Sequence, residues 1–270
     1  MSDLRIFSYL PNPRVWKATI AARLCGVRVE VIGATPAELK DWLWDFDARP
    51  LTETERASAG ATAARTGFSG TLHKTGAFLQ AHPFGTVPAA FSPDGETGIF
   101  ESNSIMRAVA RLGEDRFPLY GRDPYQAARI DSFLDVSLIF ARDMQIYLLA
   151  LGGTSLTPEI HARARDAFAT YAQGIERALS EGQAYLVGND VTLADICFAA
   201  EFGLFSNERL RRKPLAEKGL APILRDGIEA EYPHAYSHFS RLAAHTAFAP
   251  DMAPYLEKIA ARLTSEATAA

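Results

Sequence analysis

A proline lies two residues into a run that otherwise has the composition of a β-strand. The run is TVPAAF at residues 86–91, and a second strand pattern, TGIF, follows at 97–100. Proline removes a hydrogen bond from a strand ladder, which confines it to strand starts, edges and bulges. Some other benefit must therefore keep Pro88 at this position.

The residues around this run alternate between strand and helix patterns. LRIFSYL and VRVEVIG flank a helix pattern that starts at Asn12 and Pro13, a cap and a first-turn proline, and ends before Gly26. The strands at about 87–91 and 97–100 are joined by a PDG turn and precede another amphipathic helix. This order predicts an α/β thioredoxin-like domain over residues 1–112.

In such a sheet the third strand begins beside a pocket. We predict that the Val87–Pro88 peptide bond is cis and that Val87 offers its backbone N–H and C=O to a bound peptide. A trans proline at a strand start is the alternative.

The segment FESNSI supplies a second half of this pocket. A helix is expected to begin near Ser102, so that its hydroxyl and the helix N-terminus favour an anionic carboxylate. Glu101 could accept hydrogen bonds from a neighbouring ammonium group. Together they fit the α-amino acid end of a ligand, and the alternative is that Ser102 is a plain helix cap.

Residues 34–76 interrupt this domain by far more than a typical connection. PAELKDWLWDFDARPL, at 36–51, predicts a short amphipathic helix, and the small residues of 57–70 predict a flexible tract. Trp42, Trp44 and Phe46 could form a lid or a partner contact. They could equally attach the excursion to the outer face of the sheet.

From Asp123 and Pro124, a second cap and first-turn pair, the pattern is helical throughout. Residues 124–270 are predicted to form an all-helical domain for substrate and dimer contacts.

Composition favours a small-molecule or protein partner. The net charge is −4 and 22% of the residues are charged, with no basic face, which argues against nucleic acid. The N-terminus has no apolar stretch long enough for a signal peptide or a membrane span, so we expect a cytoplasmic protein. Cys25 and Cys197 are expected to be buried free thiols, and no metal site is expected.

Three motifs together resemble the cytosolic glutathione transferase superfamily. ESNSI after the VP strand looks like its glutathione-site signature, and YLVGNDVTLADI at 185–196 looks like its C-terminal folding motif, in which Thr192 and Asp195 form a capping box. With YLPNPRVWKATIAA at 9–22, the chain most resembles the glutathione-transferase-like domain of elongation factor 1 gamma. We expect it to lack the second domain that usually follows there.

The resemblance implies the glutathione transferase fold, glutathione as cofactor, and a homodimer or a heterodimer with a related chain. It implies glutathione-binding residues at Thr86, Val87, Pro88, Glu101 and Ser102. The usual basic contact before TVP is replaced by Gly85, which leaves His82, Lys74 and Thr86 as candidates.

The catalytic site implied by the resemblance lies at the first strand-to-helix turn. There Asn12, Tyr9 and Arg14, with Ser8, are candidates to hold the glutathione sulfur as thiolate, although a simple cap role for Asn12 is the alternative. A pocket for the electrophile is expected on the first long helix of the second domain, at Phe140, Asp143, Met144 and Tyr147.

Two functions follow. The enzyme interpretation is a transferase whose bound thiolate attacks a small hydrophobic or aromatic electrophile, by conjugation, by halide or ether displacement, or by aryl-ether cleavage. The alternative is a non-catalytic binding and dimerisation scaffold of the kind found in translation elongation factor complexes, because the usual catalytic residue is missing.

Overall fold

The computed structural model describes residues 2–58, 62–63, 68, 70–113, 117–153 and 155–269. The chain divides into two compact units, Met1–Phe117 and Pro118–Ala270. The predicted flexible tract at 57–70 lies largely outside the described residues.

The first unit contains a four-stranded sheet in the order β2-β1-β7-β8. The strands are β1 (Leu4–Tyr9), β2 (Val29–Ala34), β7 (Ala89–Phe91) and β8 (Gly98–Phe100). β1 pairs in parallel with β2, and β7 is antiparallel to both β1 and β8. This is the thioredoxin-like arrangement predicted from the order of the elements.

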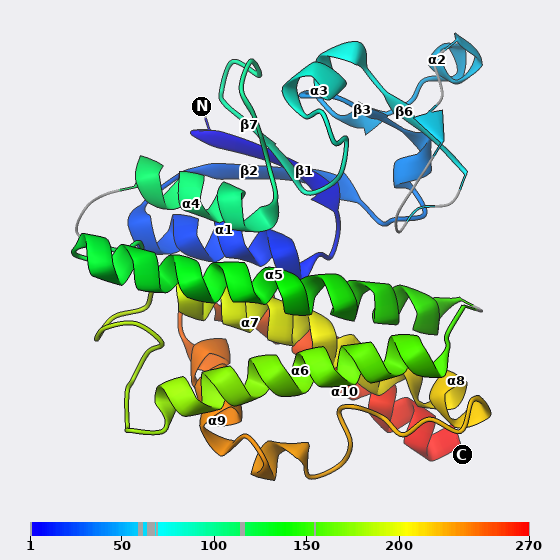
Figure 1. Ribbon diagram of the computed structural model, residues 1–270. Helices are drawn as coiled ribbons and strands as arrows, with labels where there is room; N and C mark the ends of the chain where they lie inside the picture. The colour runs from blue at the N-terminus through cyan, green and yellow to red at the C-terminus, as the bar shows by residue number, and fades with distance from the viewer. Residues whose placement is uncertain are drawn as a thin grey trace. The chain divides into compact units, whose positions relative to one another are not determined.

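Helices α1 (Pro13–Cys25) and α4 (Ser102–Leu112) pack together against one face of this sheet (Figure 1). α1 begins and ends where its sequence predicts. Asn12 caps it by accepting a hydrogen bond from Arg14 N–H, Pro13 opens the first turn, and Gly26 ends it in the left-handed conformation at a φ of 76°.

The long connection builds a second small sheet, which the sequence patterns do not predict. Its order is β4-β3-β6-β5, made from β3 (Trp42–Trp44), β4 (Arg49–Pro50), β5 (Thr62–Ala63) and β6 (Thr71–Lys74). The connection also contains η1 (Leu39–Asp41) and α2 (Glu53–Ser58), and α3 (Gly76–Ala81) follows it.

The amphipathic helix predicted over residues 36–51 is wrong. A single 3-10 turn, η1, leads directly into β3, because Trp44 is needed as a buried strand residue. Its indole N–H donates to Leu39 C=O at 2.9 Å, and its ring packs edge-on against Phe7 of β1 and Phe78 of α3. Tertiary packing overrides a local helical period here.

The second unit contains only helices among its described residues. They are α5 (Pro124–Gly152), α6 (Pro158–Leu179), α7 (Leu193–Phe205), η2 (Ser206–Arg211), α8 (Arg212–Glu217), η3 (Ile228–Ala230), α9 (Pro233–Ala244) and α10 (Ala249–Ala269). Asp123 caps α5 through Tyr125 N–H and Gln126 N–H, as predicted.

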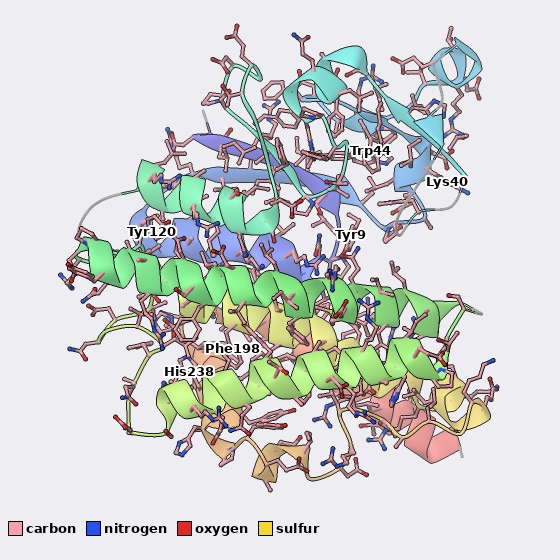
Figure 2. All side chains as sticks on the ribbon, viewed as in Figure 1. Tyr9, Lys40, Trp44, Tyr120, Phe198 and His238 are labelled. Atoms are coloured by element: carbon pink, nitrogen blue, oxygen red, sulfur yellow. The ribbon has the colours of Figure 1, made fainter. Side chains whose placement is uncertain are left out.

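The predicted capping box at the start of α7 is confirmed, and it extends further than the sequence indicates. Asp195 accepts hydrogen bonds from Thr192 N–H and Thr192 Oγ1, and also from Leu186 N–H. His238 Nε2 lies 2.9 Å from the same carboxylate, and its ring stacks on Phe198 (Figure 2). This buried carboxylate therefore joins α7, α9 and the preceding loop.

Both cysteines are buried free thiols, as predicted. None of the described helices has a stretch that combines the length and apolar character needed to cross a bilayer.

Candidate functional site

The candidate site is built where β7 starts and β8 ends. The Val87–Pro88 peptide bond is cis, as predicted. Both ladders of β7 begin at Ala89, which pairs with Phe7 on one side and Phe100 on the other. Neither ladder of the described sheet therefore uses the backbone N–H and C=O of Val87, which is only half-buried.

The β7–β8 register places this free backbone beside the start of α4. Since Ala89 pairs with Phe100, continuing the antiparallel register brings Val87 to the level of Ser102. The two halves of the pocket predicted from separate motifs therefore meet at one end of the sheet.

Glu101 is held in an unusual backbone conformation. Its φ is 66° and its ψ is 122°, and no other non-glycine residue in the described part of the chain has a positive φ. Such a conformation costs about 1–3 kcal/mol and persists where the surroundings impose it, most often at functional sites. The Glu101 side chain is exposed and makes no cap hydrogen bond to α4.

Ser102 is the first residue of α4 rather than its cap. Glu101 occupies the cap position, and the first intrahelical bond runs from Ile105 N–H to Glu101 C=O. The backbone N–H groups of the first turn therefore have no partner within the helix. Together with the helix dipole, they form a surface suited to a carboxylate.

A side chain that the sequence patterns do not single out lies directly behind this turn. Lys17 of α1 is 1% exposed, and its Nζ donates to Ser102 Oγ at 3.2 Å and to Asn103 Oδ1 at 2.7 Å. The one available signal was a lysine within the otherwise apolar stretch VWKATIAA. Only the packing of α1 on α4 reveals its target.

The loop before Val87 is organised by His82. The ring is fully buried, stacks on Phe100 at a centroid distance of 4.9 Å, and accepts a hydrogen bond from Thr86 N–H at Nε2. Burial, with the nearby charge of Lys74, lowers the pKa of His82. His82 thus fixes the conformation of Thr86 from inside the unit instead of presenting its own ring at the surface.

Lys74 contacts the same loop through its ammonium group. Its ammonium donates to Gly85 C=O at 2.7 Å and sits over the Trp44 ring at 5.1 Å. The side chain is half-buried, so a positive charge is present beside the loop that leads to Val87.

The β1–α1 turn holds the three predicted catalytic residues. Asn12 is 2% exposed, and both polar atoms of its amide are in use: Oδ1 accepts from Arg14 N–H and Nδ2 donates to Ser8 Oγ at 3.0 Å. Val15 N–H bonds to Asn12 C=O, and Pro13 has no N–H. The backbone N–H groups of Arg14 and Val15 in the first turn of α1 are therefore already hydrogen-bonded within the protein.

Tyr9 and Arg14 complete this turn. Tyr9 is the last residue of β1 (Figure 2). It is half-buried, and its ring centroid lies 6.4 Å from that of Phe68. Arg14 is half-buried in the first turn of α1.

The predicted electrophile pocket on α5 is wrong for three of its four residues. Phe140, Met144 and Tyr147 are at most 1% exposed and belong to the core of the second unit. The Tyr147 hydroxyl donates to buried Glu208 at 3.0 Å, which helps to raise the pKa of this tyrosine beyond the effect of burial. Their helical spacing marks the face of α5 that packs on α6 and α7.

Asp143, the fourth residue, forms ion pairs with Arg142 and Arg163. The exposed aliphatic residues of α5 are different ones: Val136, Leu138, Ile139, Ile146 and Leu149.

The fold is that of the glutathione transferases: a thioredoxin-like unit followed by an all-helical unit. A family model described as "Glutathione S-transferase, C-terminal domain" matches residues 144–246. This match assigns residues 144–246 to the C-terminal domain family of the glutathione S-transferases.

The chain is similar in sequence to relatives of two kinds. Elongation factor 1-gamma 1 of Oryza sativa subsp. japonica is 27% identical over 84% of this chain and 43% of its own length. The glutathione S-transferase-like protein FUS3 of Gibberella moniliformis is 28% identical over 72% of this chain and 74% of its own length. The chain thus spans less than half of the elongation factor relatives that it matches.

Among solved structures, Ure2p5 of Phanerochaete chrysosporium, cocrystallised with 1-(S-glutathionyl)-2,4-dinitrobenzene, has the same fold. It superposes with a TM-score of 0.63 over 96% of this chain and 97% of its own, at 16% identity.

Proposed function

We propose that this chain binds glutathione and transfers its sulfur to a small hydrophobic or aromatic electrophile. One observation carries the proposal: the strained turn at Glu101 sets the open first turn of α4 level with the unpaired backbone of Val87. A peptide with an α-amino acid end matches this arrangement of groups.

In the proposed complex the cysteinyl backbone of glutathione adds to the sheet edge at Val87, as an extra antiparallel strand. The γ-glutamyl carboxylate lies against Ser102 and the first turn of α4, and its ammonium faces Glu101. Lys74 and Thr86 lie on the side of the glycine carboxylate. The likeness to Ure2p5, whose crystals held a glutathione adduct, supports glutathione as the ligand.

The chemistry we propose needs the thiol to lose its proton, because the thiolate is the nucleophile. The sulfur then forms a bond to an electrophilic carbon, and a halide or an aryloxide leaves with the electrons of the broken bond. Tyr9, Arg14 and the second amide hydrogen of Asn12 are the groups proposed to stabilise the thiolate. The backbone of the first turn of α1 adds nothing further, since its donors are taken.

Calorimetry with glutathione and a conjugation assay with 1-chloro-2,4-dinitrobenzene test this function together. We expect saturable binding of glutathione, no binding of Ala-Cys-Gly, which lacks the γ-glutamyl end, and release of one chloride per adduct formed. Absence of glutathione binding to the folded protein would refute the proposal. Because cytosolic thiol pools consist largely of glutathione, we place the activity in the cytoplasm.

A second function is favoured by the state of Asn12. Its amide oxygen caps α1 and one of its two amide hydrogens is donated to Ser8, which leaves a single hydrogen for a thiolate. Relatives of this chain also include elongation factor 1-gamma proteins. A scaffold that binds glutathione without chemistry would give the same calorimetric result. It would show no conjugation above the uncatalysed rate, with any of several haloarene or aryl-ether substrates.

A further inference from the structure

The feature that the proposed function leaves unexplained is the buried ammonium group of Lys17. Burying a charged amine is costly unless it is paired or hydrogen-bonded, and a lysine side chain usually extends its ammonium group to water instead. Lys17 is 1% exposed, although it lies in the middle of α1. Its ammonium reaches across to the first turn of α4, where two of its contacts are Ser102 and Asn103.

The direction of these hydrogen bonds is fixed by chemistry. An ammonium group has three donors and no acceptor, whereas a serine hydroxyl has one donor and two acceptor lone pairs. In the 3.2 Å contact Ser102 Oγ must therefore accept from Lys17 Nζ. The hydroxyl proton of Ser102 then points to a different partner.

The Asn103 contact holds the ammonium in place. Asn103 is 2% exposed, and its Oδ1 accepts from Lys17 Nζ at 2.7 Å, the length of a strong charge-assisted hydrogen bond. Lys17 is thus fixed behind the helix turn, with Ser102 between its charge and the outer surface.

The charge is unfavourable for the helix itself. The N-terminus of α4 already carries the positive end of the helix dipole, so a cation beside it is repelled where an anion would be attracted. An anion bound at the same turn would be attracted by the ammonium of Lys17 as well as by the helix N-terminus.

We propose that Lys17 is a positioning residue for the α-carboxylate of the γ-glutamyl group of glutathione. It fixes the Ser102 hydroxyl as a donor toward that carboxylate and adds a positive charge behind it. This inference rests on the proposed function, because it concerns how glutathione is held.

Two variants and two ligands test it by calorimetry. Lys17→Met removes the charge and the donors but keeps most of the side-chain length. Asn103→Asp leaves Lys17 in place and neutralises it with an adjacent carboxylate. The second ligand is 4-aminobutanoyl-Cys-Gly, which is glutathione without the α-carboxylate. Arg23→Met, on the exposed side of α1, is the control for a lost positive charge.

We expect both site variants to bind glutathione about 10- to 100-fold more weakly, the range for hydrogen bonds to charged groups. Wild type and variants should bind the decarboxylated ligand with equal affinity, because this ligand lacks the α-carboxylate that Lys17 is proposed to position. Arg23→Met should bind both ligands as the wild type does.

Other outcomes separate this inference from the proposed function. Unchanged glutathione affinity in folded Lys17→Met or Asn103→Asp would overturn it, and glutathione binding itself would stand. Equal losses for both ligands would also overturn it, since they would show that Lys17 merely holds α1 against α4. If the wild-type protein binds no glutathione, the proposed function fails and this inference with it.

Discussion

The amide of Asn12 donates to the hydroxyl of Ser8 at 3.0 Å, and both side chains are buried. Asn12 also accepts the N–H of Arg14, so this residue links the end of β1 to the first turn of α1. The sequence predicts two roles for Asn12, as a helix cap and as a partner of the thiolate. The geometry shows the cap, whose contribution to the stability of the fold can be measured.

Replacing Asn12 by alanine is expected to lower the free energy of unfolding by about 1–2 kcal/mol, from the lost cap and the unpaired buried hydroxyl of Ser8. Urea denaturation measures this loss. If Asn12 also stabilises the glutathione thiolate, kcat for conjugation should fall by a larger factor in Asn12→Ala than the affinity for glutathione does. A variant as stable as the wild type would contradict the cap.

Ser102→Ala is expected to weaken glutathione binding by about 1–3 kcal/mol, because a carboxylate would be left short of one hydrogen bond. Calorimetry on the folded variant measures the loss. Ser132→Ala, which removes an exposed hydroxyl from α5, is the matched control and should change nothing. Wild-type affinity in Ser102→Ala would show that the hydroxyl does not touch the ligand.

The pKa of His82 is lowered, chiefly by burial, which has a consequence for stability at mild acidity. The folded state favours the neutral ring of His82. The contribution of His82 to the free energy of unfolding is therefore fully present above pH 6.5, the ordinary pKa of histidine, and is lost as the pH falls below 6.5 toward the lower pKa of the folded state. Protonation would also remove the acceptor for Thr86 N–H.

The variant His82→Gln tests this dependence, because its side-chain oxygen can still accept from Thr86 N–H and does not titrate. The difference in unfolding free energy between the wild type and this variant should be constant above pH 6.5 and should shift against the wild type below it. His234→Gln, at an exposed histidine, serves as the control. A difference that does not change with pH would exclude His82 as the source.

Trp44→Ala is expected to destabilise the first unit by about 3–5 kcal/mol, the usual loss for a large buried aromatic side chain. Trp44 is 1% exposed and packs on Phe7 and Phe78. For the same reason, replacing residues 37–70 by a glycine-serine linker should unfold this unit. Denaturant unfolding of Trp44→Ala, with half-buried Trp42→Ala as the comparison, measures the effect. A stable Trp44→Ala protein with altered substrate selectivity would restore the lid interpretation.

Light scattering on the purified protein should give twice the 29.5 kDa mass of one chain, if it is a homodimer. Phe84 is 71% exposed on the loop before Val87, and we expect it to contribute to the association of the two chains. Phe84→Ser should then lower the measured mass at low concentration and leave the fold unchanged. A monomer at all concentrations would mean that another chain is required.

Much of the fold follows from local signals. The caps at Asn12 and Asp123, the capping box at Thr192 and Asp195, and the PDG hairpin each satisfy backbone groups within a few residues of one another. Such features are legible in the sequence because the partners are neighbours along the chain. The order of strands and helices then leaves few possible topologies.

Two predictions based on helical spacing were wrong, each for its own reason. Phe140, Met144 and Tyr147 were correctly placed on one face of a helix, but spacing cannot tell a face that packs on the core from one that faces a ligand. Residues 36–51 also show a helical period, yet Trp44 and Phe46 pack against Phe7 and Phe91 of the main sheet, which requires an extended backbone.

The sequence by itself determined the local patterns from which a site at Val87, Pro88, Glu101 and Ser102 is predicted, because a proline within a strand and a cap-like turn after a hairpin each involve residues close along the chain. Only the tertiary structure decided what lies behind them. Lys17 is 85 residues from Ser102 along the chain, and the two meet because α1 packs on α4. A contact over that separation leaves no periodic signal in the sequence, since it is set by how the helices pack on a common sheet.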